Sequence, residues 1–427
     1  NLDNLELISK LSMKVLGKPY VQAVVSSTVK YRYDEGMKTG GTFGVNYPHY
    51  KDLVPTFGFN MIYLAKDVRL RIYEMIMDKF WRPFNEEVFI KSRSWYTCGE
   101  PCPVVCKKVW RGKKVDYEPF NGLGPMIGVF DLELVSRLVD LTDELGFDAI
   151  ELGHVISWIF DAIEKGLLKP EELGLKSKPY FNPKNFKYEY SKHNAELAER
   201  LVLGLIKKEN EILKLIAEKG LRVAAKELDK RFEDRVKRLG LKFEDIATYV
   251  ALGSEGYMTP NYYWTPGMVA PLFILGRYWT NYTPTFMEPE DFAASSLMRA
   301  IKEYEVDNAG ICRFHRRWAE KMLKTLYNEL LNIKVDLDKH AKAMYRKIAE
   351  YSILVNAEPR FWESKKTMDI ISTIANEVNN KDWVHKFNTE GIKAFKDWWN
   401  RFYRKVSEEL GIKYGIEKVR VIQSSGN

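Results

Sequence analysis

The four cysteines of this 427-residue chain constrain its fold more than any other feature of the sequence. Cys98, Cys102 and Cys106 lie within nine residues, in the stretch CGEPCPVVC, and Cys312 follows 206 residues later (312 − 106 = 206). One loop that supplies three thiolates, joined by a distant fourth, is the layout of an iron–sulfur or zinc site. We therefore expect the chain to fold so that Cys312 reaches the other three around an inorganic centre.

The spacing of these cysteines favours an iron–sulfur cluster over zinc. Structural zinc sites usually show two Cys-x-x-Cys pairs or pairs of Cys and His. This chain instead has three cysteines plus one, a proline after the second cysteine and few histidines nearby. Ordinary buried cysteines are a weaker interpretation, because three of them rarely lie so close in sequence. A non-catalytic helical protein with a structural zinc site made of the four cysteines is the alternative from another functional class.

Composition excludes several classes of protein. Hydrophobic residues make up 45% of the chain and aromatic residues 13%, which is enough for a large core and argues against disorder. The net charge of +8 is spread over segments in which basic and acidic residues alternate, so no nucleic-acid partner is expected. The longest apolar stretches, such as residues 268–276, are too short to span a membrane. Four cysteines are too few for a disulfide scaffold in so long a chain, and we expect a cytoplasmic protein.

Hydrophobic residues recur at helical spacing through most of the chain. Helices are predicted over residues 3–16, 67–81, 131–145, 151–166, 194–219, 221–238, 288–304, 314–332, 336–355, 366–378 and 390–411. Two long segments, residues 26–65 and 252–286, are rich in Gly, Pro and aromatic residues and are predicted to be irregular. The sequence therefore predicts a mainly α protein with two helical domains, over residues 1–190 and 191–427.

Two short segments of the chain share one pattern. TDELGFDAI (142–150) and VDNAGICRF (306–314) each contain Asp-x-x-Gly, an apolar residue and then Asp or Cys. The aligned residues are Asp143, Gly146 and Asp148 in the first segment and Asp307, Gly310 and Cys312 in the second. Each segment lies at the end of a predicted helix, where glycine is a natural stop. On pattern alone a chance match is favoured, although the second copy contains the fourth cysteine.

Three polar side chains each have an ordinary and a functional interpretation. Glu118, in VDYEPF, is a solvated carboxylate if isolated, but between aromatic residues and beside a cofactor it would be a general base with a raised pKa. His154 lies on an apolar helix, where a hydrogen-bonded core histidine is the usual explanation. His315 lies three residues past Cys312 and either hydrogen-bonds a sulfide or is exposed.

Three basic residues lie in the two segments predicted to be irregular. Lys30 and Arg32 belong to the first segment and Arg277 to the second. Arginine is well suited to bidentate phosphate binding, although a surface ion pair is the ordinary explanation for each residue. The turn GTFG (41–44) has no predicted helix after it, so it is not a phosphate-binding glycine loop of the P-loop or Rossmann type.

Together these segments resemble the tungstopterin aldehyde:ferredoxin oxidoreductase family, and most closely its glyceraldehyde-3-phosphate:ferredoxin oxidoreductase branch. The resemblance rests on STVKYRY…TGGTFG (26–44), TCGEPCPVVCKK (97–108), YEPF…GP (117–125), DELGFDAIELG (143–153), GRYWTNY (276–282) and DNAGICRFHRRW (307–318). These segments follow the family's order and spread over most of the chain.

The resemblance implies cofactors and residue roles. The four cysteines would ligate one 4Fe–4S cluster, and tungsten or molybdenum would be held by two pterins, with magnesium at the cofactor phosphates. Asp143 and Asp307 would accept hydrogen bonds from pterin amines in the two similar turns, and Glu118 would be the catalytic base beside the metal. The other implied cofactor-binding residues are Gly146, Asp148 and Gly310, and the candidate substrate-binding residues are Arg277, Lys30, Arg32 and His154.

The implied reaction is a glycolytic one, the oxidation of glyceraldehyde 3-phosphate to 3-phosphoglycerate with ferredoxin as electron acceptor. The mild basic balance of the chain suits an acidic ferredoxin, and another aldehyde is the alternative substrate. Two departures from the family are visible. Residues 252–286 contain no histidine, where other branches have a catalytic one, so Tyr262, Tyr263 or Trp264 would shape the pocket. The family's amino-terminal β domain is not matched, and the resemblance implies that a companion chain or that domain is needed for activity.

Overall fold

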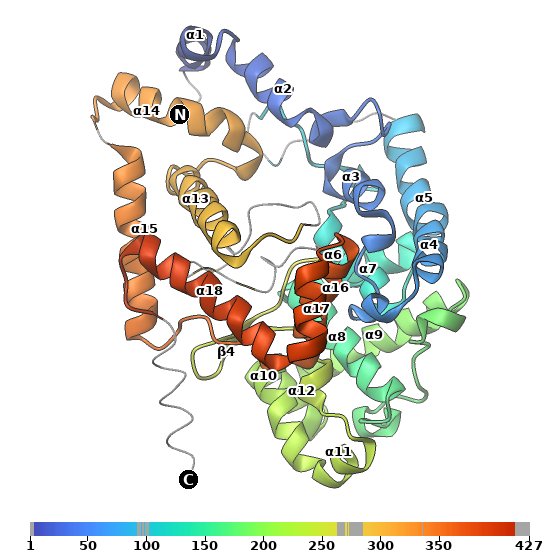
Figure 1. Ribbon diagram of the computed structural model, residues 1–427. Helices are drawn as coiled ribbons and strands as arrows, with labels where there is room; N and C mark the ends of the chain where they lie inside the picture. Colours follow the sequence, from blue (N-terminus) through green and yellow to red (C-terminus); the bar gives the residue numbers. More distant parts are fainter. Residues whose placement is uncertain are drawn as a thin grey trace.

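The structure is mainly helical, which confirms the predicted fold class (Figure 1). It is a computed structural model that describes residues 4–91, 95, 98, 102–262, 270, 272, 285–334 and 336–414. In this described part of the chain, strands form only two short antiparallel hairpins. They are β1 (Val109–Trp110) with β2 (Lys113–Lys114), and β3 (Val250–Leu252) with β4 (Gly256–Met258). None of the described helices combines the length and the apolar character needed to cross a membrane.

The helices of the described ranges fall into two groups along the chain. The first group comprises α1 (Leu5–Leu16), α2 (Tyr20–Tyr33), α3 (Gly41–Tyr50), α4 (Lys66–Met75), η4 (Ile76–Trp81), α5 (Arg82–Asn85), η5 (Glu86–Lys91), α6 (Tyr117–Gly122), α7 (Leu132–Glu144) and α8 (Ala149–Glu164). The second group comprises α9 (Tyr190–Lys207), α10 (Glu211–Arg231), α11 (Glu233–Leu239), α12 (Phe243–Ile246), α13 (Pro289–Asn308), η10 (Arg313–His315), α14 (Arg316–Leu331), α15 (Leu337–Leu354), α16 (Lys365–Glu377), α17 (Lys381–Glu390) and α18 (Ile392–Leu410). Single 3-10 turns lie at η2 (Lys51–Leu53), η3 (Asn60–Tyr63), η6 (Pro125–Ile127), η7 (Pro170–Leu173) and η8 (Pro183–Asn185).

The prediction that residues 26–65 are irregular was wrong for much of the segment. α2 extends to Tyr33, and α3 begins at Gly41, so GTFG (41–44) is itself the first turn of a helix. The buried face of α3 carries Phe43, Tyr47 and Tyr50 at helical spacing, and these rings pack against other aromatic residues. Burial of this aromatic stripe against other helices stabilises α3. Its Gly and Pro residues have low helix propensity, so the sequence alone did not predict it.

Two predicted helix boundaries between residues 194 and 238 were also wrong. α9 ends at Lys207, and Asn210 then caps α10 by accepting hydrogen bonds from the N–H groups of the second and third residues of that helix. α10 continues past Gly220, where the backbone is kinked with φ 72° and ψ 174°. The phenol oxygen of Tyr257 accepts the N–H of Leu221 at 2.8 Å, so a tertiary contact satisfies the donor that the kink leaves free.

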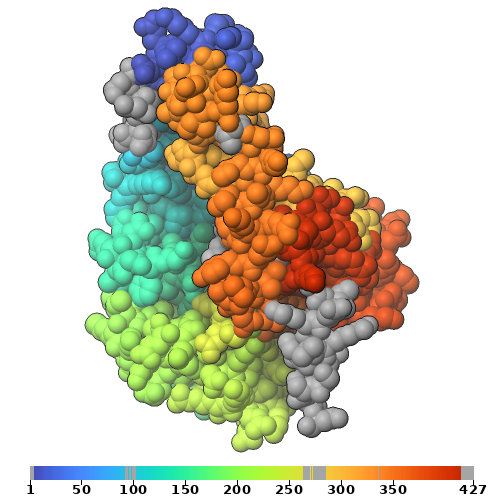
Figure 2. All heavy atoms as spheres, turned by 90° about the vertical axis from the view of Figure 1, so that its left-hand side faces the viewer, coloured from blue at the N-terminus to red at the C-terminus, as the bar shows by residue number. Residues whose placement is uncertain are grey.

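The helices form two groups on opposite sides of the centre of the molecule, and α2 runs from one group to the other (Figure 1). On one side α13 packs against α15 and α18, and α14 packs against α1 and α2. On the other side α3 packs against α6, and α6 packs against α8. In the view of Figure 2, α14 and α15, in orange, run along one face from the blue amino-terminal helices downward. Segments from the two halves of the chain therefore lie side by side.

Two hydrophobic clusters hold these helices together. The large cluster runs from Tyr33 to Leu410 and contains residues from both predicted domains. The small cluster, which we call the cysteine-side cluster, consists of Leu11, Tyr20, Ala23, Val24, Val104, Val306, Trp318, Ala319, Met322 and Leu323. It also joins the two halves of the chain, and the predicted division at residues 190 and 191 stays a prediction.

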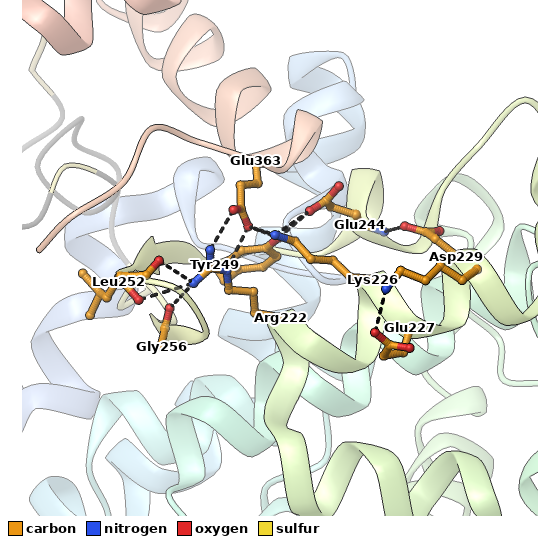
Figure 3. Close-up of polar contacts among 11 residues, drawn as sticks. Arg222, Lys226, Glu227, Asp229, Glu244, Tyr249, Leu252, Gly256 and Glu363 are labelled. Carbon is orange, nitrogen blue, oxygen red and sulfur yellow. Dashed lines mark hydrogen bonds and ion pairs between the residues drawn. The ribbon is translucent and has the colours of Figure 1, made fainter. Parts of the chain in front are cut away.

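The buried guanidinium of Arg222, on α10, fastens the β3–β4 hairpin to the rest of the protein (Figure 3). It donates to the two carboxylate oxygens of Glu363 at 2.9 and 2.8 Å and to the carbonyl of Gly256 at 2.7 Å. Tyr249 and Lys226 also contact the Glu363 carboxylate, at 3.0 and 2.8 Å. Since a buried charge is tolerated only when it is fully paired, this network fixes the hairpin and the segment that follows it.

Candidate cofactor site

All four cysteines line one cavity of about 570 Å³. Cys102 and Cys106 are half-buried, Cys98 and Cys312 are exposed, and none of them forms a disulfide. The remaining walls are mainly apolar side chains of α1 and α14 and of the turn between α13 and α14. The fold therefore brings Cys312 to the three cysteines of the loop, although it comes from a segment 206 residues away (312 − 106 = 206).

The cysteine-side cluster explains this meeting. Val104 lies between the second and third cysteines and is completely buried against the cluster. Val306, at the end of α13, and Trp318, in the first turn of α14, belong to the same cluster and flank Cys312. Burying a valine of this kind contributes about 1.5–3 kcal/mol. Hydrophobic burial therefore draws the two cysteine-bearing segments together.

Two basic side chains donate hydrogen bonds to the backbone of the cysteine loop. Arg32 donates from Nη1 to the carbonyl of Pro103 at 2.6 Å, and the buried Lys108 donates from Nζ to the carbonyl of Val105 at 2.7 Å. Val105 has φ 42°, an unfavourable conformation for a β-branched residue. Such strain persists only where the surroundings enforce it and is common at functional sites. Arg32 thus contacts the backbone of the cysteine loop, and its predicted role in substrate binding stays a prediction.

The glycines of TGGTFG provide the space for this packing. A Cβ on Gly40 would lie 2.7 Å from the carbonyl oxygen of Arg32, and one on Gly41 would lie 2.6 Å from Cγ of Lys108. Gly41 also has φ 70°, which favours glycine. The glycines are therefore required by the close approach of α3 to the cysteine loop.

The electrostatic environment of the cysteines calls for a positive centre. The backbone N–H groups of Val104 and Val105 donate to the Cys102 sulfur, and burial raises the pKa of that thiol. Burial, followed by the charges of Cys312 and Cys102, raises the pKa of Cys106 to about 11. A metal or cluster would compensate the charge of the deprotonated sulfurs and so favour their thiolate form. The donor set thus fits a thiolate-ligated inorganic group.

Zinc and a 4Fe–4S cluster place different demands on the spacing of four thiolates. Among the residues that the structure describes, no three His, Cys, Asp or Glu side chains are grouped closely enough to hold one metal ion. A tetrahedral zinc site with Zn–S bonds of about 2.3 Å needs its sulfurs within about 4 Å of one another. A 4Fe–4S cluster binds each cysteine to a different iron and therefore accepts a wider ring of thiolates.

The two Asp-x-x-Gly segments fold into the same backbone turn. Gly146 and Gly310 have φ 75° and 69°, and each donates its N–H to the carbonyl of the Asp three residues earlier, at 3.1 and 2.9 Å. The following residues, Phe147 and Ile311, each donate to the carbonyl five residues earlier, at 3.0 and 3.1 Å. Both segments are thus helix C-caps of one type, at the ends of α7 and α13.

The two turns differ in the residue that follows them. The carboxylate of Asp148 accepts the N–H groups of Ile150 and Glu151, both at 2.9 Å, and so caps α8. At the matching place Cys312 lines the cysteine cavity. A Cβ added to Gly146 or Gly310 would meet nothing within 4 Å, so the space beside both turns is open for a ligand. Asp143 is exposed and Asp307 is half-buried.

Glu118 lies in the first turn of α6, half-buried among tyrosines. Thr42 Oγ1 accepts the N–H of Tyr117 at 3.1 Å, and the Tyr117 phenol donates to the carbonyl of Tyr262 at 2.9 Å, which fixes this turn. The tyrosines whose pKa is raised first by burial and also by the charge of Glu118 are Tyr31, Tyr47, Tyr117 and Tyr262. The carboxylate therefore faces an aromatic, hydroxyl-bearing environment.

His154 is a buried histidine with its hydrogen bond satisfied. Its Nε2–H donates to the carbonyl of Pro260 at 2.8 Å, and its ring stacks between Phe59 and Tyr262, with centroid distances of 5.9 and 5.2 Å. Burial, with a smaller contribution from Lys366, lowers the pKa of His154 to about 4, so the ring is neutral. These contacts match the core histidine that its apolar helix suggested.

Tyr262 is also part of the core. Its phenol donates to the carbonyl of Ile150 at 2.8 Å, and it occupies a notch between α6 and α8. A Cβ on Gly122 or Gly153 would lie 2.5 Å from that phenol oxygen. Arg277, Tyr263 and Trp264 lie outside the described residues.

Lys30 lies where α2 meets α14, among cations that the sequence analysis did not single out. Its pKa is lowered by burial and then by the charges of Arg317 and Arg316. Arg317 donates to the carbonyl of Ser27, one turn before Lys30, at 3.4 Å, and the rings of Tyr31 and Phe314 are 4.4 Å apart. The sequence signal for these arginines was their place in CRFHRRW, four and five residues past Cys312.

Comparison with known proteins agrees with this geometry. The sequence model of the family described as aldehyde ferredoxin oxidoreductase, domains 2 & 3, matches residues 22–358. The chain belongs to the aldehyde ferredoxin oxidoreductase family. That match covers both Asp-x-x-Gly turns and all four cysteines.

Curated relatives of this aldehyde ferredoxin oxidoreductase family member include proteins of Methanocaldococcus and Pyrococcus species. The chain is 42% identical over 418 residues to an uncharacterized protein of Methanocaldococcus jannaschii, covering 96% of this chain and 66% of that protein. It is 40% identical over 394 residues to the glyceraldehyde-3-phosphate:ferredoxin oxidoreductase of Pyrococcus furiosus, covering 91% and 60%. It is 23% identical over 406 residues to a tungsten-containing aldehyde ferredoxin oxidoreductase of Pyrococcus abyssi, covering 90% and 63%. The chain thus spans less than two thirds of the length of these relatives.

Replacing Gly41 by alanine is expected to destabilise the protein and to disturb the cysteine loop. Positive φ alone costs an alanine about 1–2 kcal/mol, and the overlap of its methyl group with Lys108 adds about 1–3 kcal/mol. The free energy of unfolding, measured by denaturant titration, should fall by the sum of these costs.

Gly17→Ala is the matched control, because Gly17 has φ 66° and nothing lies within 4 Å of its Cβ position. Only the backbone cost of about 1–2 kcal/mol is expected there. Equal losses of stability in the two variants would contradict the packing of Gly41 against Lys108.

Proposed function

We propose that this chain forms the cluster- and pterin-binding part of a cytoplasmic ferredoxin-dependent aldehyde oxidoreductase, with glyceraldehyde 3-phosphate as substrate. The observation that carries the proposal is the single cavity lined by four cysteines, one of which directly follows one of two matched glycine turns. The substrate is supported by the similarity to the Pyrococcus furiosus enzyme named for it. Another aldehyde is the competing substrate, because a relative of similar identity carries no named activity.

The proposed reaction converts an aldehyde and one water into a carboxylate, three protons and two electrons. Ferredoxin accepts one electron at a time, so two ferredoxins are reduced for each aldehyde oxidised. The net charge of +8 favours an acidic protein partner of this kind. The product from glyceraldehyde 3-phosphate would be 3-phosphoglycerate.

Two groups that this chain would bind supply the redox chemistry. Tungsten or molybdenum held by two pterins takes the electron pair from the aldehyde when bound, and the 4Fe–4S cluster passes single electrons onward. Cys98, Cys102, Cys106 and Cys312 would ligate the cluster. Asp143 and Asp307 would accept hydrogen bonds from pterin amines, and magnesium would accompany the cofactor phosphates.

Each pterin would bind beside one of the two turns, where the glycine leaves open space. Gly146 and Gly310 leave space beside the backbone, which allows a flat ring to approach the helix end. Because Cys312 follows Gly310 by two residues, a pterin at the second turn would lie beside the cluster. This adjacency would give electrons a short route between the two groups.

Glu118 is the proposed general base. Its carboxylate would accept a proton as water or the aldehyde hydrate reacts, and the buried tyrosines around it would keep bulk water away. The clamped first turn of α6 would hold the carboxylate in one place, since Tyr117 is hydrogen-bonded at both its N–H and its phenol.

Lys30, Arg316 and Arg317 are proposed to hold the substrate phosphate. Arg316 pairs with Glu303 at 3.4 Å, whereas within the described ranges neither Lys30 nor Arg317 forms an ion pair. Crowded cations without a counter-ion attract an anion, and arginine suits phosphate geometry. Arg277 was predicted to share this role.

Replacing Cys312 by serine is expected to remove most of the cluster. Anaerobically purified protein should be brown and contain about four irons per chain, and the variant should lose most of its iron and its visible absorbance because one thiolate ligand is gone. Iron and zinc analysis with an absorption spectrum provides the measurement.

Ala309→Ser is the control for this variant, because Ala309 lines the same cavity without a sulfur, and its iron content should not change. A colourless wild-type protein that contains zinc in place of iron would refute the proposed cluster and favour the structural zinc alternative.

Glu118→Gln is expected to lower kcat for aldehyde oxidation by about 10²–10⁴-fold in the holoenzyme that contains this chain, because the amide cannot accept the proton. Ferredoxin reduction by glyceraldehyde 3-phosphate is the assay. Glu133→Gln is the matched control, since Glu133 lies in the first turn of α7 on an exposed surface. Wild-type kcat in Glu118→Gln would exclude Glu118 as the base.

Lys30→Gln and Arg317→Gln are each expected to lower kcat/KM for glyceraldehyde 3-phosphate by about 10–100-fold through a higher KM, because a charge-assisted hydrogen bond to phosphate is lost. Rates with unphosphorylated aldehydes should stay unchanged. Lys38→Gln provides the control, since this exposed lysine pairs only with Glu35 among the described side chains.

Two results would contradict the phosphate assignment. Equal effects on phosphorylated and plain aldehydes would mean that the cations do not recognise the substrate phosphate. A loss of pterin and tungsten from either variant, measured by metal analysis, would mean that these cations hold a cofactor phosphate.

A further inference from the structure

His315 connects the two halves of the cysteine site. It ends η10, and its backbone N–H donates to the carbonyl of Cys312 at 2.8 Å. Its side chain is buried, and Nε2 lies 3.7 Å from the sulfur of Cys102. The same residue therefore contacts the distant cysteine through its backbone and a loop cysteine through its ring.

Tyr20 holds the imidazole in this orientation. The Tyr20 phenol oxygen lies 3.2 Å from Nε2, and the two rings are parallel within 2°, with centroids 6.2 Å apart. Trp318 packs edge-on against Tyr20 at 4.9 Å and donates from Nε1 to Ser12 Oγ at 3.2 Å. Packing from α1, α2 and α14 thus leaves the imidazole little freedom to turn.

The chemistry of the partners decides the direction of the hydrogen bond. A metal-bound cysteine sulfur has no proton and only accepts. A hydrogen bond from the ring to that sulfur therefore requires the proton on Nε2. The Tyr20 phenol oxygen, 3.2 Å from Nε2, then accepts from the same N–H.

The hydrogen bond from His315 differs from the other hydrogen bonds to the Cys102 sulfur. The backbone N–H groups of Val104 and Val105 also donate to the Cys102 sulfur, but a side-chain substitution does not remove them. In the described part of the chain, His315 is the only side chain with a hydrogen bond to a cysteine sulfur. It is consequently the donor that a substitution can test.

We infer that His315 is a positioning residue that donates its Nε2–H to the Cys102 sulfur and raises the reduction potential of the cluster. The inference rests on the proposed 4Fe–4S cluster. Reduction adds negative charge to the cluster and its sulfurs, so a donor stabilises the reduced form more than the oxidised form. The chain thereby sets how readily the cluster takes an electron before ferredoxin removes it.

His315→Phe removes the donor while keeping a ring of similar size in the buried site. The midpoint potential of the cluster, measured by an anaerobic redox titration followed by electron paramagnetic resonance, should fall. A tenfold lower ratio of reduced to oxidised cluster at a fixed potential is expected, which corresponds to about 59 mV for one electron.

His315→Gln is the rescue variant, because its amide N–H reaches a similar place and should return the potential toward that of the wild type. Tyr20→Phe removes the competing acceptor and should not lower the potential. His340→Phe, at an exposed position on α15, is the matched control and should leave the potential unchanged.

A measurement on the unsubstituted protein covers the case in which His315→Phe does not fold. With ¹⁵N-labelled histidine, pulsed paramagnetic resonance of the reduced cluster should detect coupling to one histidine nitrogen. A fully loaded His315→Phe cluster at the wild-type potential, or the absence of that nitrogen coupling, would overturn the role of His315. An iron-free wild-type protein would instead overturn the proposed function on which the inference rests.

Discussion

The site depends on one hydrophobic contact between distant parts of the chain. Val104, inside the cysteine loop, and Trp318, just past Cys312, are buried in the cysteine-side cluster together with residues of α1 and α2. Four thiolates would not gather without such a force, because each negative sulfur opposes the next. Apolar burial holds the cysteine-bearing segments together, and an inorganic centre would then compensate the charge of the sulfurs. Stability and cofactor binding are therefore coupled at this point of the fold.

The repeated helix end gives the site its second constraint. Both Asp-x-x-Gly segments use a left-handed glycine to end a helix and to turn the chain, with the same two hydrogen bonds. The two turns differ in the side chain two residues after the glycine. Asp148 caps a long helix, and Cys312 lines the cavity. One backbone conformation thus ends a helix in both halves of the chain, and the residue two positions after the glycine differs between them.

The sequence predicted the features that depend on local chemistry. The spacing of the cysteines indicated a shared site, and the amphipathic helices from α13 to α16 begin and end within a few residues of their predicted bounds. The helix predicted over residues 151–166 is α8 (Ala149–Glu164), again within a few residues of its predicted bounds. These features follow from side-chain spacing, which a single segment contains.

The sequence failed where a distant partner decides the structure. α3 is stabilised by aromatic packing against other helices, and its Gly and Pro residues concealed it. The continuation of α10 past Gly220 depends on the Tyr257 phenol. The roles of Arg32 and Lys108 under the cysteine loop could not be inferred, because a basic side chain near a site has the same sequence pattern whether it binds phosphate or a backbone carbonyl.

The charges around Tyr31 would determine which end of the proposed substrate approaches Glu118. Burial raises the pKa of Tyr31, the charges of Arg316 and Arg317 lower it, and the charge of Glu118 raises it. The amine of Lys30 is 4.9 Å from the centroid of the same ring. The phosphate of a phosphorylated aldehyde would be repelled by the Glu118 carboxylate and attracted by the cations. The aldehyde end is then the end that can approach Glu118. A plain aldehyde lacks this electrostatic preference, so the same residues that bind the phosphate would also orient the reacting carbon.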